Sequence, residues 1–215
     1  MNRYQVASFK LKVKCLYGIK NKVILITGAG KGNGRLLAEA FAKQGAIVAA
    51  NDISPINVED VVASVNANGG KAKAYIEDVA KKVGAQALIK NVEDDFGTID
   101  VLINHATVEP RVSLLKMDEW DWHRVLDVNL TGAFLMVQSI GRMMKEKGSG
   151  VIISLVAETS ETSEKEAGAY FTSQAGLREL SNQADQELSL HGVKVFVVEN
   201  SENAIENIFA LLEDV

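Results

Sequence analysis

The sequence predicts an α/β protein with a doubly wound parallel sheet between two layers of helices. From residue 21 onward, short β-rich runs alternate with longer segments of helical periodicity. The run VILIT at residues 23–27 is almost wholly apolar, as expected of a strand that is buried on both faces. A glycine-rich segment, residues 28–34, follows this run directly and precedes a helical pattern. Together these observations predict a three-layer α/β/α arrangement with parallel strands.

Each expected strand is a short run bounded by polar residues or glycine. The six expected strands cover residues 23–27, 46–50, 71–76, 99–104, 150–154 and 193–198. The helices are expected where apolar residues recur at spacings of three and four. They cover approximately residues 36–41, 58–65, 82–96, 118–147, 166–190 and 202–212.

Length and composition are those of one ordinary domain. The chain has 215 residues, of which 47% are apolar and 24% charged, as in soluble globular proteins. We expect an N-terminal extension over residues 1–20 and a single domain over residues 21–215. The extension is basic and alternates weakly between polar and apolar residues, which fits an additional strand, a frayed arm or a targeting peptide.

Charge and cysteine content argue against several classes of function. The net charge of -5 disfavours binding to nucleic acid and to anionic membranes. The single cysteine, Cys15, can form no internal disulfide, and no apolar run approaches the ~18 residues expected of a membrane-spanning helix. The acidic residues near 158–166 form no plausible metal cluster with the available histidines. We therefore expect a cytoplasmic protein without a metal site, which binds neither nucleic acid nor membrane.

The glycine-rich turn predicts a dinucleotide site. It contains Gly28, Lys31, Gly32, Asn33 and Gly34, between a buried strand and a helix. Glycines let the backbone turn sharply and approach a pyrophosphate, and the start of the helix offers free N–H groups to it. The alternative is a structural turn that binds nothing.

Asp52, followed by Ile53, indicates which cofactor is preferred. It ends the second expected strand and lies 18 residues after Gly34 (52 − 34), near the ~20 expected for the acid that binds the adenosine ribose. A carboxylate accepts a hydrogen bond from a free 2′-hydroxyl and repels a 2′-phosphate. We therefore expect NAD rather than NADP, although Lys31 could pair with a 2′-phosphate.

Five segments in the same order resemble the short-chain dehydrogenase/reductase family, which has the Rossmann fold. They are TGAGKGNG from Thr27, the pair Asp78-Val79, INHAT with Asn104 and Ala106, VNLTG with Asn129, and AYFTSQAGL with Tyr170. The likeness runs from about residue 21 to residue 198. It implies that Asp78 and Val79 hold the adenine, and that Asn104 and Ala106 belong to the cofactor site.

The resemblance also implies an acid–base mechanism. In the family a tyrosine transfers the proton of an alcohol or carbonyl, a lysine lowers the tyrosine pKa, a serine fixes the substrate oxygen and an asparagine supports a relay water. Tyr170 and Asn129 stand at the tyrosine and asparagine positions. Gln174, one helical turn after Tyr170, stands where the family has its lysine and lacks the charge that would favour a phenolate. Tyr170 is therefore either catalytic or a structural tyrosine.

The serine position is not matched either. It falls on Ala157 by spacing or on Leu155 by motif, and Ser154 is the nearest hydroxyl. The chain then passes almost directly from the sixth strand to a final helix, without the family's substrate lid and seventh strand. His105 either contacts the cofactor or packs inertly.

Two functions are compatible with this pattern. The first is an NAD(H)-binding oxidoreductase that transfers hydride between the nicotinamide and a small alcohol or carbonyl substrate, with impaired chemistry. The second is a non-catalytic dinucleotide-binding or scaffold protein. It is also conceivable that neither cofactor nor substrate binds. The resemblance further implies a homodimer or homotetramer.

Overall fold

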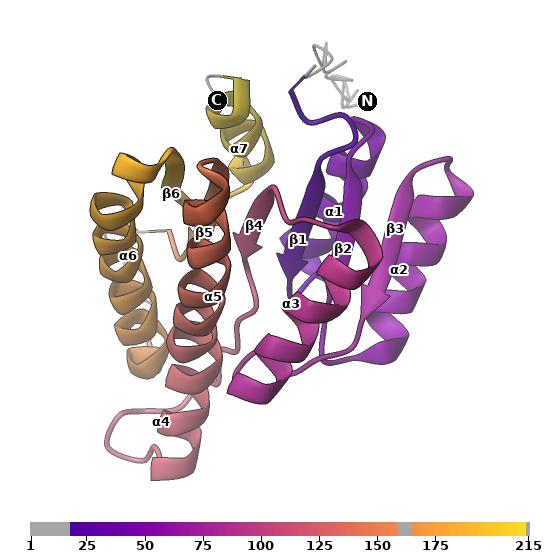
Figure 1. Ribbon diagram of the computed structural model, residues 1–215. Helices are drawn as coiled ribbons and strands as arrows, with labels where there is room; N and C mark the ends of the chain where they lie inside the picture. The colour runs from indigo at the N-terminus through magenta and orange to yellow at the C-terminus, as the bar shows by residue number, and fades with distance from the viewer. Residues whose placement is uncertain (1–17, 159–164, 214–215) are drawn as a thin grey trace, which may run out of the picture.

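The predicted doubly wound sheet is confirmed by the computed structural model, which describes residues 18–158 and 165–213 (Figure 1). Its strands are β1 (Val23–Thr27), β2 (Ile47–Asn51), β3 (Lys71–Tyr75), β4 (Val101–Asn104), β5 (Gly150–Val156) and β6 (Val193–Glu199). They form one sheet of six strands in the order β3-β2-β1-β4-β5-β6, and every neighbouring pair is parallel. Within the described residues no seventh strand extends this sheet.

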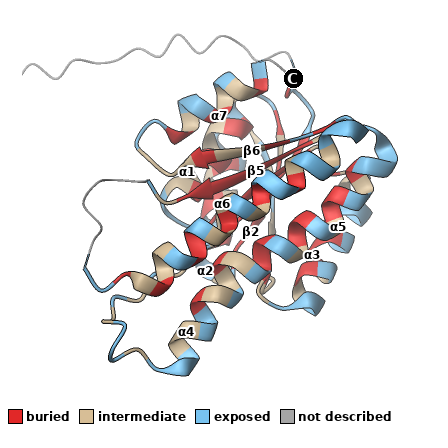
Figure 2. Cartoon of the chain, turned by 90° about the vertical axis from the view of Figure 1, so that its left-hand side faces the viewer, coloured by how far each residue is buried: buried red, intermediate tan, exposed pale blue. Residues whose placement is uncertain are grey.

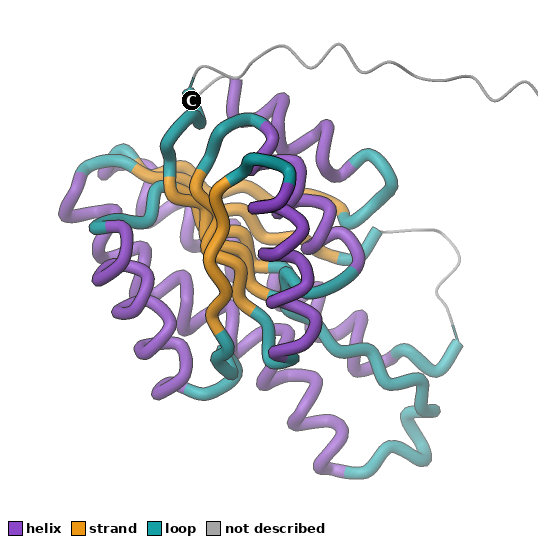
Figure 3. The backbone as a smooth tube through the Cα atoms, turned by 90° about the vertical axis from the view of Figure 1, so that its right-hand side faces the viewer, coloured by secondary structure: helices purple, strands orange, loops and turns teal. Residues whose placement is uncertain are grey.

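The sheet lies between two layers of helices (Figure 3). The helices are α1 (Gly32–Lys43), α2 (Pro55–Ala67), α3 (Lys82–Phe96), α4 (Glu119–Leu126), α5 (Gly132–Lys147), α6 (Gly168–Leu188) and α7 (Ala204–Glu213). One buried core joins the sheet to α1, α2 and α7, and a second joins it to α3, α5 and α6. The helices carry buried residues on the side that faces the sheet and exposed residues on the other (Figure 2).

The expected single helix over residues 118–147 is wrong in one respect. A π-helical segment, Asp127–Thr131, separates α4 from α5 and brings Asn129 into the interior, where it is 1% exposed. The wider turn lets the Asn129 side chain reach the chain that follows β4. Such π segments occur frequently at functional sites.

The final helix, α7, packs against α1. Ala204, Ile208 and Leu212 are buried, and the Phe209 ring meets the Phe41 ring edge-on with centroids 5.1 Å apart. Only residues 200–203 lie between β6 and α7. The tail therefore completes one layer of the sandwich.

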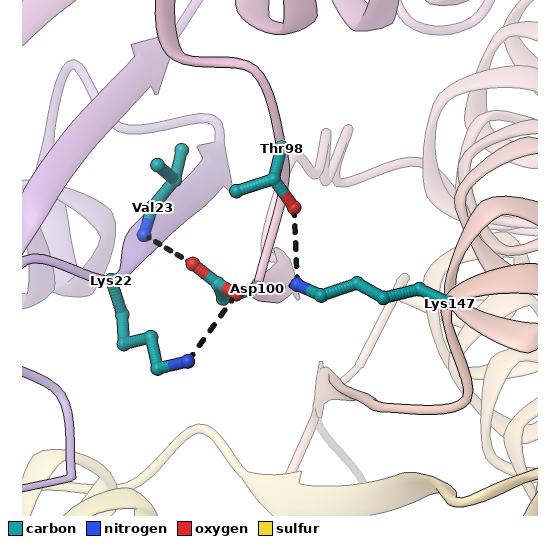
Figure 4. Close-up of polar contacts among 5 residues, drawn as sticks. All are labelled: Lys22, Val23, Thr98, Asp100 and Lys147. Atoms are coloured by element: carbon teal, nitrogen blue, oxygen red, sulfur yellow. Dashed lines mark hydrogen bonds and ion pairs between the residues drawn. The ribbon is translucent and has the colours of Figure 1, made fainter.

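Asp100 connects several elements at the amino-terminal edge of the sheet (Figure 4). Its carboxylate accepts a hydrogen bond from the Val23 N–H at 2.9 Å and lies 2.6 Å from the Lys147 ammonium and 3.6 Å from that of Lys22. Burial alone would raise the pKa of Asp100, but these partners outweigh it and hold that pKa below its usual value. This cluster joins β1, β4 and α5 on the side of the sheet opposite the candidate site.

Neither a membrane-spanning helix nor a metal-binding cluster is present in the residues that the structure describes. No helix there is both long and apolar enough to cross a bilayer. No group of three or more His, Cys, Asp or Glu side chains in the same part of the chain is arranged to hold a metal ion.

Candidate functional site

The candidate site lies where the strand order reverses, at the carboxyl ends of β1 and β4. In open α/β sheets a ligand crevice is expected at this point. Beyond the paired part of the two strands, the Thr27 hydroxyl oxygen accepts hydrogen bonds from the N–H groups of His105 and Ala106, at 3.1 and 3.2 Å. The last residue of β1 therefore fixes the chain that leaves β4.

The glycine-rich turn has no room for a side chain at Gly28 or Gly34. Gly28 has φ +67°, and a Cβ atom there would lie 2.8 Å from the Ala106 Cα atom. A Cβ at Gly34 would clash with the Gly28 carbonyl oxygen and approach His105 Nδ1 to 2.7 Å. These positions bring the turn against β4 and the start of α1 and leave the backbone accessible to a ligand.

The beginning of α1 is suited to an anion. Its N-cap, Lys31, forms no side-chain cap, and the first turn contains no acidic residue. Asn33 is engaged elsewhere, since its Nδ2 donates to Asn200 Oδ1 at 2.7 Å and to the Ser201 carbonyl at 3.5 Å. Of the turn residues predicted to bind cofactor, Gly28 and Lys31 line a cleft beside the turn, whereas Gly32, Asn33 and Gly34 do not.

The Asp52 carboxylate is held in a fixed orientation beside the glycine turn. Its Oδ2 atom accepts from the Gly30 N–H and its Oδ1 atom from the Ser54 N–H, both at 2.9 Å. The side chain is 9% exposed and lines the cleft. A carboxylate has about four acceptor sites, so these two bonds leave capacity for ribose hydroxyls.

A cleft of about 630 Å³ begins at this carboxylate, and we call it the wide cleft. Its volume is within the range of small-molecule sites. The predicted cofactor residues that line it are Gly28, Lys31, Asp52, Ile53, Asp78, Val79 and Ala106. The cleft continues to Trp120, His123 and Arg124 of α4, which the sequence did not single out.

A second cavity, the narrow cavity, has a volume of only about 10 Å³. It brings together Tyr170, Gln174, Asn104 and Asn129, and its lining includes no Lys or Arg within the described residues. Both side-chain atoms of Asn104 are buried without a hydrogen-bond partner in that part of the chain. Asn200, missed by sequence reasoning, also lines this cavity.

Gln174 is buried next to Tyr170 and is hydrogen-bonded to the chain. It is 6% exposed, and its Oε1 atom accepts from the Ala157 N–H at 2.8 Å. Ala157 is one of the two positions to which the family's serine was aligned. The amide of Gln174 therefore ties the start of the segment after β5 to α6.

Asn129 uses its side chain to connect three segments. Its Oδ1 atom accepts from the Val108 N–H at 2.8 Å, and its Nδ2 atom donates to the Val108 carbonyl at 2.9 Å and to Ser173 Oγ at 3.0 Å. Both amide protons are thus used within the protein. Support of a relay water by Asn129 stays a prediction.

Ser154 lies apart from the other predicted catalytic residues. It is fully buried, its Oγ atom is 2.9 Å from Ser181 Oγ on α6, and it does not line the narrow cavity. The β5 residue that does line this cavity is Leu155.

His105 lines both cavities. Its Nδ1 atom is 3.1 Å from the Gly28 carbonyl oxygen and, because a carbonyl only accepts, carries the proton in this contact. Burial lowers the pKa of His105 more than its backbone contacts raise it. The ring is therefore neutral at neutral pH and presents Nε2 as an acceptor.

Comparison with known proteins identifies the family. The pattern of the short chain dehydrogenase family matches residues 22–202. D-threitol dehydrogenase of Mycolicibacterium smegmatis is 32% identical over 186 residues, which cover 86% of this chain and 72% of the relative. The 5-keto-D-gluconate 5-reductase of Escherichia coli is 32% identical over 199 residues, which cover 93% of this chain and 78% of the relative.

Solved structures agree with this assignment. A metagenomic short-chain oxidoreductase in complex with NADP superposes with a TM-score of 0.84 at 27% identity, covering 92% of this chain and 93% of the other. An NAD⁺-bound xylitol dehydrogenase gives a TM-score of 0.80 at 28% identity, covering 84% of this chain and 70% of the other. With its doubly wound sheet and glycine-rich turn, the chain therefore belongs to the short-chain dehydrogenase/reductase family of oxidoreductases.

Proposed function

We propose that this protein is an NAD(H)-binding member of the family whose hydride-transfer chemistry is impaired. The observation that carries the proposal is Gln174, a neutral amide beside Tyr170 in a cavity whose described lining has no Lys or Arg. In the family a lysine at this position favours the phenolate of the tyrosine, and the neutral amide of Gln174 supplies no such charge.

The cofactor part of the site fits a dinucleotide. The glycine turn has no space for a Cβ atom at Gly28 or Gly34, and the first turn of α1 has no acidic residue. Asp52 faces the cleft with acceptor capacity for ribose hydroxyls. This carboxylate supports a preference for NAD, and Lys31 remains the group that would favour a 2′-phosphate.

The roles of the protein's own groups follow from their positions. A bound nicotinamide supplies or accepts the hydride. Tyr170 would hold the proton of the substrate oxygen, and the residue at the position of the family's lysine, Gln174, is a neutral amide. Ser154 is bonded to Ser181 outside the narrow cavity, so a catalytic role for its hydroxyl would require a rearrangement of β5.

The second candidate function is a non-catalytic dinucleotide-binding protein. The small volume of the narrow cavity, about 10 Å³, favours it. In either case we propose a small molecule as the ligand and a homodimer or homotetramer as the assembly. Phe134 of α5, which is 41% exposed, is one apolar side chain available to such an interface.

The test begins with binding and proceeds to turnover. NADH and NADPH are titrated while nicotinamide fluorescence is followed, and absence of a saturable signal for both would refute either function. Alcohols and ketones, including D-threitol and xylitol, are then screened for hydride transfer. Tyr170→Phe should abolish any activity that is found.

The Gln174→Lys variant tests whether a missing positive charge at this position is the main cause of impaired hydride transfer. General acid–base catalysis is typically worth 10²–10⁴-fold, so we expect at least a tenfold gain in kcat if the missing charge is the main defect. Gln183→Lys, which adds the same charge on the exposed side of α6, is the matched control and should change nothing. No gain from Gln174→Lys, in a variant that still binds NADH, would favour the non-catalytic function.

A further inference from the structure

The two cavities of the site differ greatly in volume. The wide cleft measures about 630 Å³ and the narrow cavity about 10 Å³. A small-molecule site usually measures ~300–1,000 Å³, and a single water needs ~10–15 Å³. The wide cleft thus has room for a nucleotide, whereas the space beside Tyr170 has room for one water.

The wide cleft offers the groups that an adenosine diphosphate would use. Asp52 supplies acceptors for ribose hydroxyls, and Lys31 lies beside the uncapped start of α1, where a diphosphate would lie. Ile53 is 69% exposed and lines the cleft, as a surface for a flat ring. Neither Tyr170 nor Gln174 lines this cleft.

Three contacts hold the groups around the narrow cavity in place. Gln174 is bonded to the Ala157 N–H at 2.8 Å, and Asn33 joins the glycine turn to Asn200 at 2.7 Å. His105, at the junction of both cavities, is bonded to the Gly28 carbonyl at 3.1 Å. With a volume of about 10 Å³ the narrow cavity has no room for a nicotinamide ring, so groups that line it would have to move for the ring to enter.

The amide of Asn104 lines the narrow cavity, and a small polar species there would supply the hydrogen bonds that it lacks. Its amide is 3% exposed, and neither its oxygen nor its nitrogen has a partner among the described residues. A buried amide without hydrogen bonds costs about 1–3 kcal/mol. One water in the adjoining space would satisfy both atoms, and a nicotinamide would have to displace that water.

We propose that this protein recognises the adenosine diphosphate portion of its ligand and gains little affinity from the nicotinamide, so that ADP-ribose binds about as tightly as NAD. The proposal rests on the assignment of the wide cleft as the nucleotide site. It identifies the ligand class as adenosine nucleotides, of which NAD is one member.

Isothermal titration calorimetry of the full chain with NAD, ADP-ribose, AMP and nicotinamide mononucleotide tests this directly. We expect the Kd values of NAD and ADP-ribose to agree within threefold, and no binding of nicotinamide mononucleotide. A Kd for NAD at least tenfold below that of ADP-ribose would overturn the inference and leave the NAD-binding function intact. Failure of all four ligands to bind would remove both.

The Asp52→Asn variant adds an internal comparison. Both ligands carry the same adenosine ribose, so the variant should weaken NAD and ADP-ribose by the same factor. Weakening of ADP-ribose alone would contradict a shared binding mode. Glu59→Gln, which removes a charge from the exposed side of α2, is the control and should leave both Kd values unchanged.

Discussion

Replacing Asp52 by Asn tests whether this carboxylate selects the cofactor. Two unit charges 4 Å apart interact by about 1 kcal/mol in water and about 4 kcal/mol at an effective dielectric constant of ~20. Asp52 is 9% exposed but borders an open cleft, so we take about 2 kcal/mol for its repulsion of a 2′-phosphate. Since 1.36 kcal/mol corresponds to a factor of ten, the preference for NADH over NADPH should fall roughly 30-fold.

The assay must separate selectivity from damage to the turn. Asn keeps one acceptor oxygen, so one of the bonds from Gly30 N–H and Ser54 N–H is lost, at a cost of about 1 kcal/mol. That loss weakens both cofactors equally, and the ratio of the two Kd values from fluorescence titration at low salt is therefore the quantity to measure. A ratio that changes by less than threefold would refute the assigned role of Asp52. Glu59→Gln again provides the control.

Three further substitutions test the scaffold. Asp100→Asn should lower the free energy of unfolding by about 1.5–3 kcal/mol in urea denaturation. Although burial raises the pKa of Asp100, its partners hold that pKa below its usual value. The difference in unfolding free energy between the wild type and Asp100→Asn should therefore be largest above about pH 4 and shrink as the pH falls through the folded-state pKa of Asp100. Gly34→Ala should abolish nucleotide binding in titrations, because a Cβ clashes with the Gly28 carbonyl, whereas Gly18→Ala meets nothing within 4 Å and should bind normally. Phe209 is partly buried, so Phe209→Ala should remove about 3 kcal/mol of packing on α1, the lower end of the range for core phenylalanines, and lower the thermal midpoint. An unchanged midpoint would contradict the docking of α7.

Local patterns were enough to predict the fold. The apolar run of β1 and the helical spacing of α3 are properties of adjacent residues, and α3 was predicted with its observed bounds, Lys82–Phe96. The cofactor side of the site could be predicted in the same way, because the ends of neighbouring parallel strands bring a glycine turn and the acid after the next strand to one edge of the sheet. For this reason Gly28 and Asp52 line the same cleft.

The remaining features depend on contacts between distant segments. The π segment at Asp127–Thr131 shifts the hydrogen-bond pattern without interrupting the apolar periodicity, so the sequence showed a continuous helix. The Asn33–Asn200 bond spans 167 positions in the chain. The sequence indicated that Gln174 stands at the position of the family's lysine, but it gave no sign of the hydrogen bond from the Ala157 N–H to Gln174 Oε1.

The Asn33–Asn200 bond connects the candidate cofactor turn to the segment that precedes the carboxyl-terminal helix. Asn33 lies in the first turn of α1, and Asn200 and Ser201 begin the short connection to α7. A nucleotide that orders the glycine turn must, by thermodynamic linkage, also stabilise this connection and the helix beyond it. In amide hydrogen exchange α7 would therefore report occupancy of the cleft from the far side of α1, although it touches no ligand.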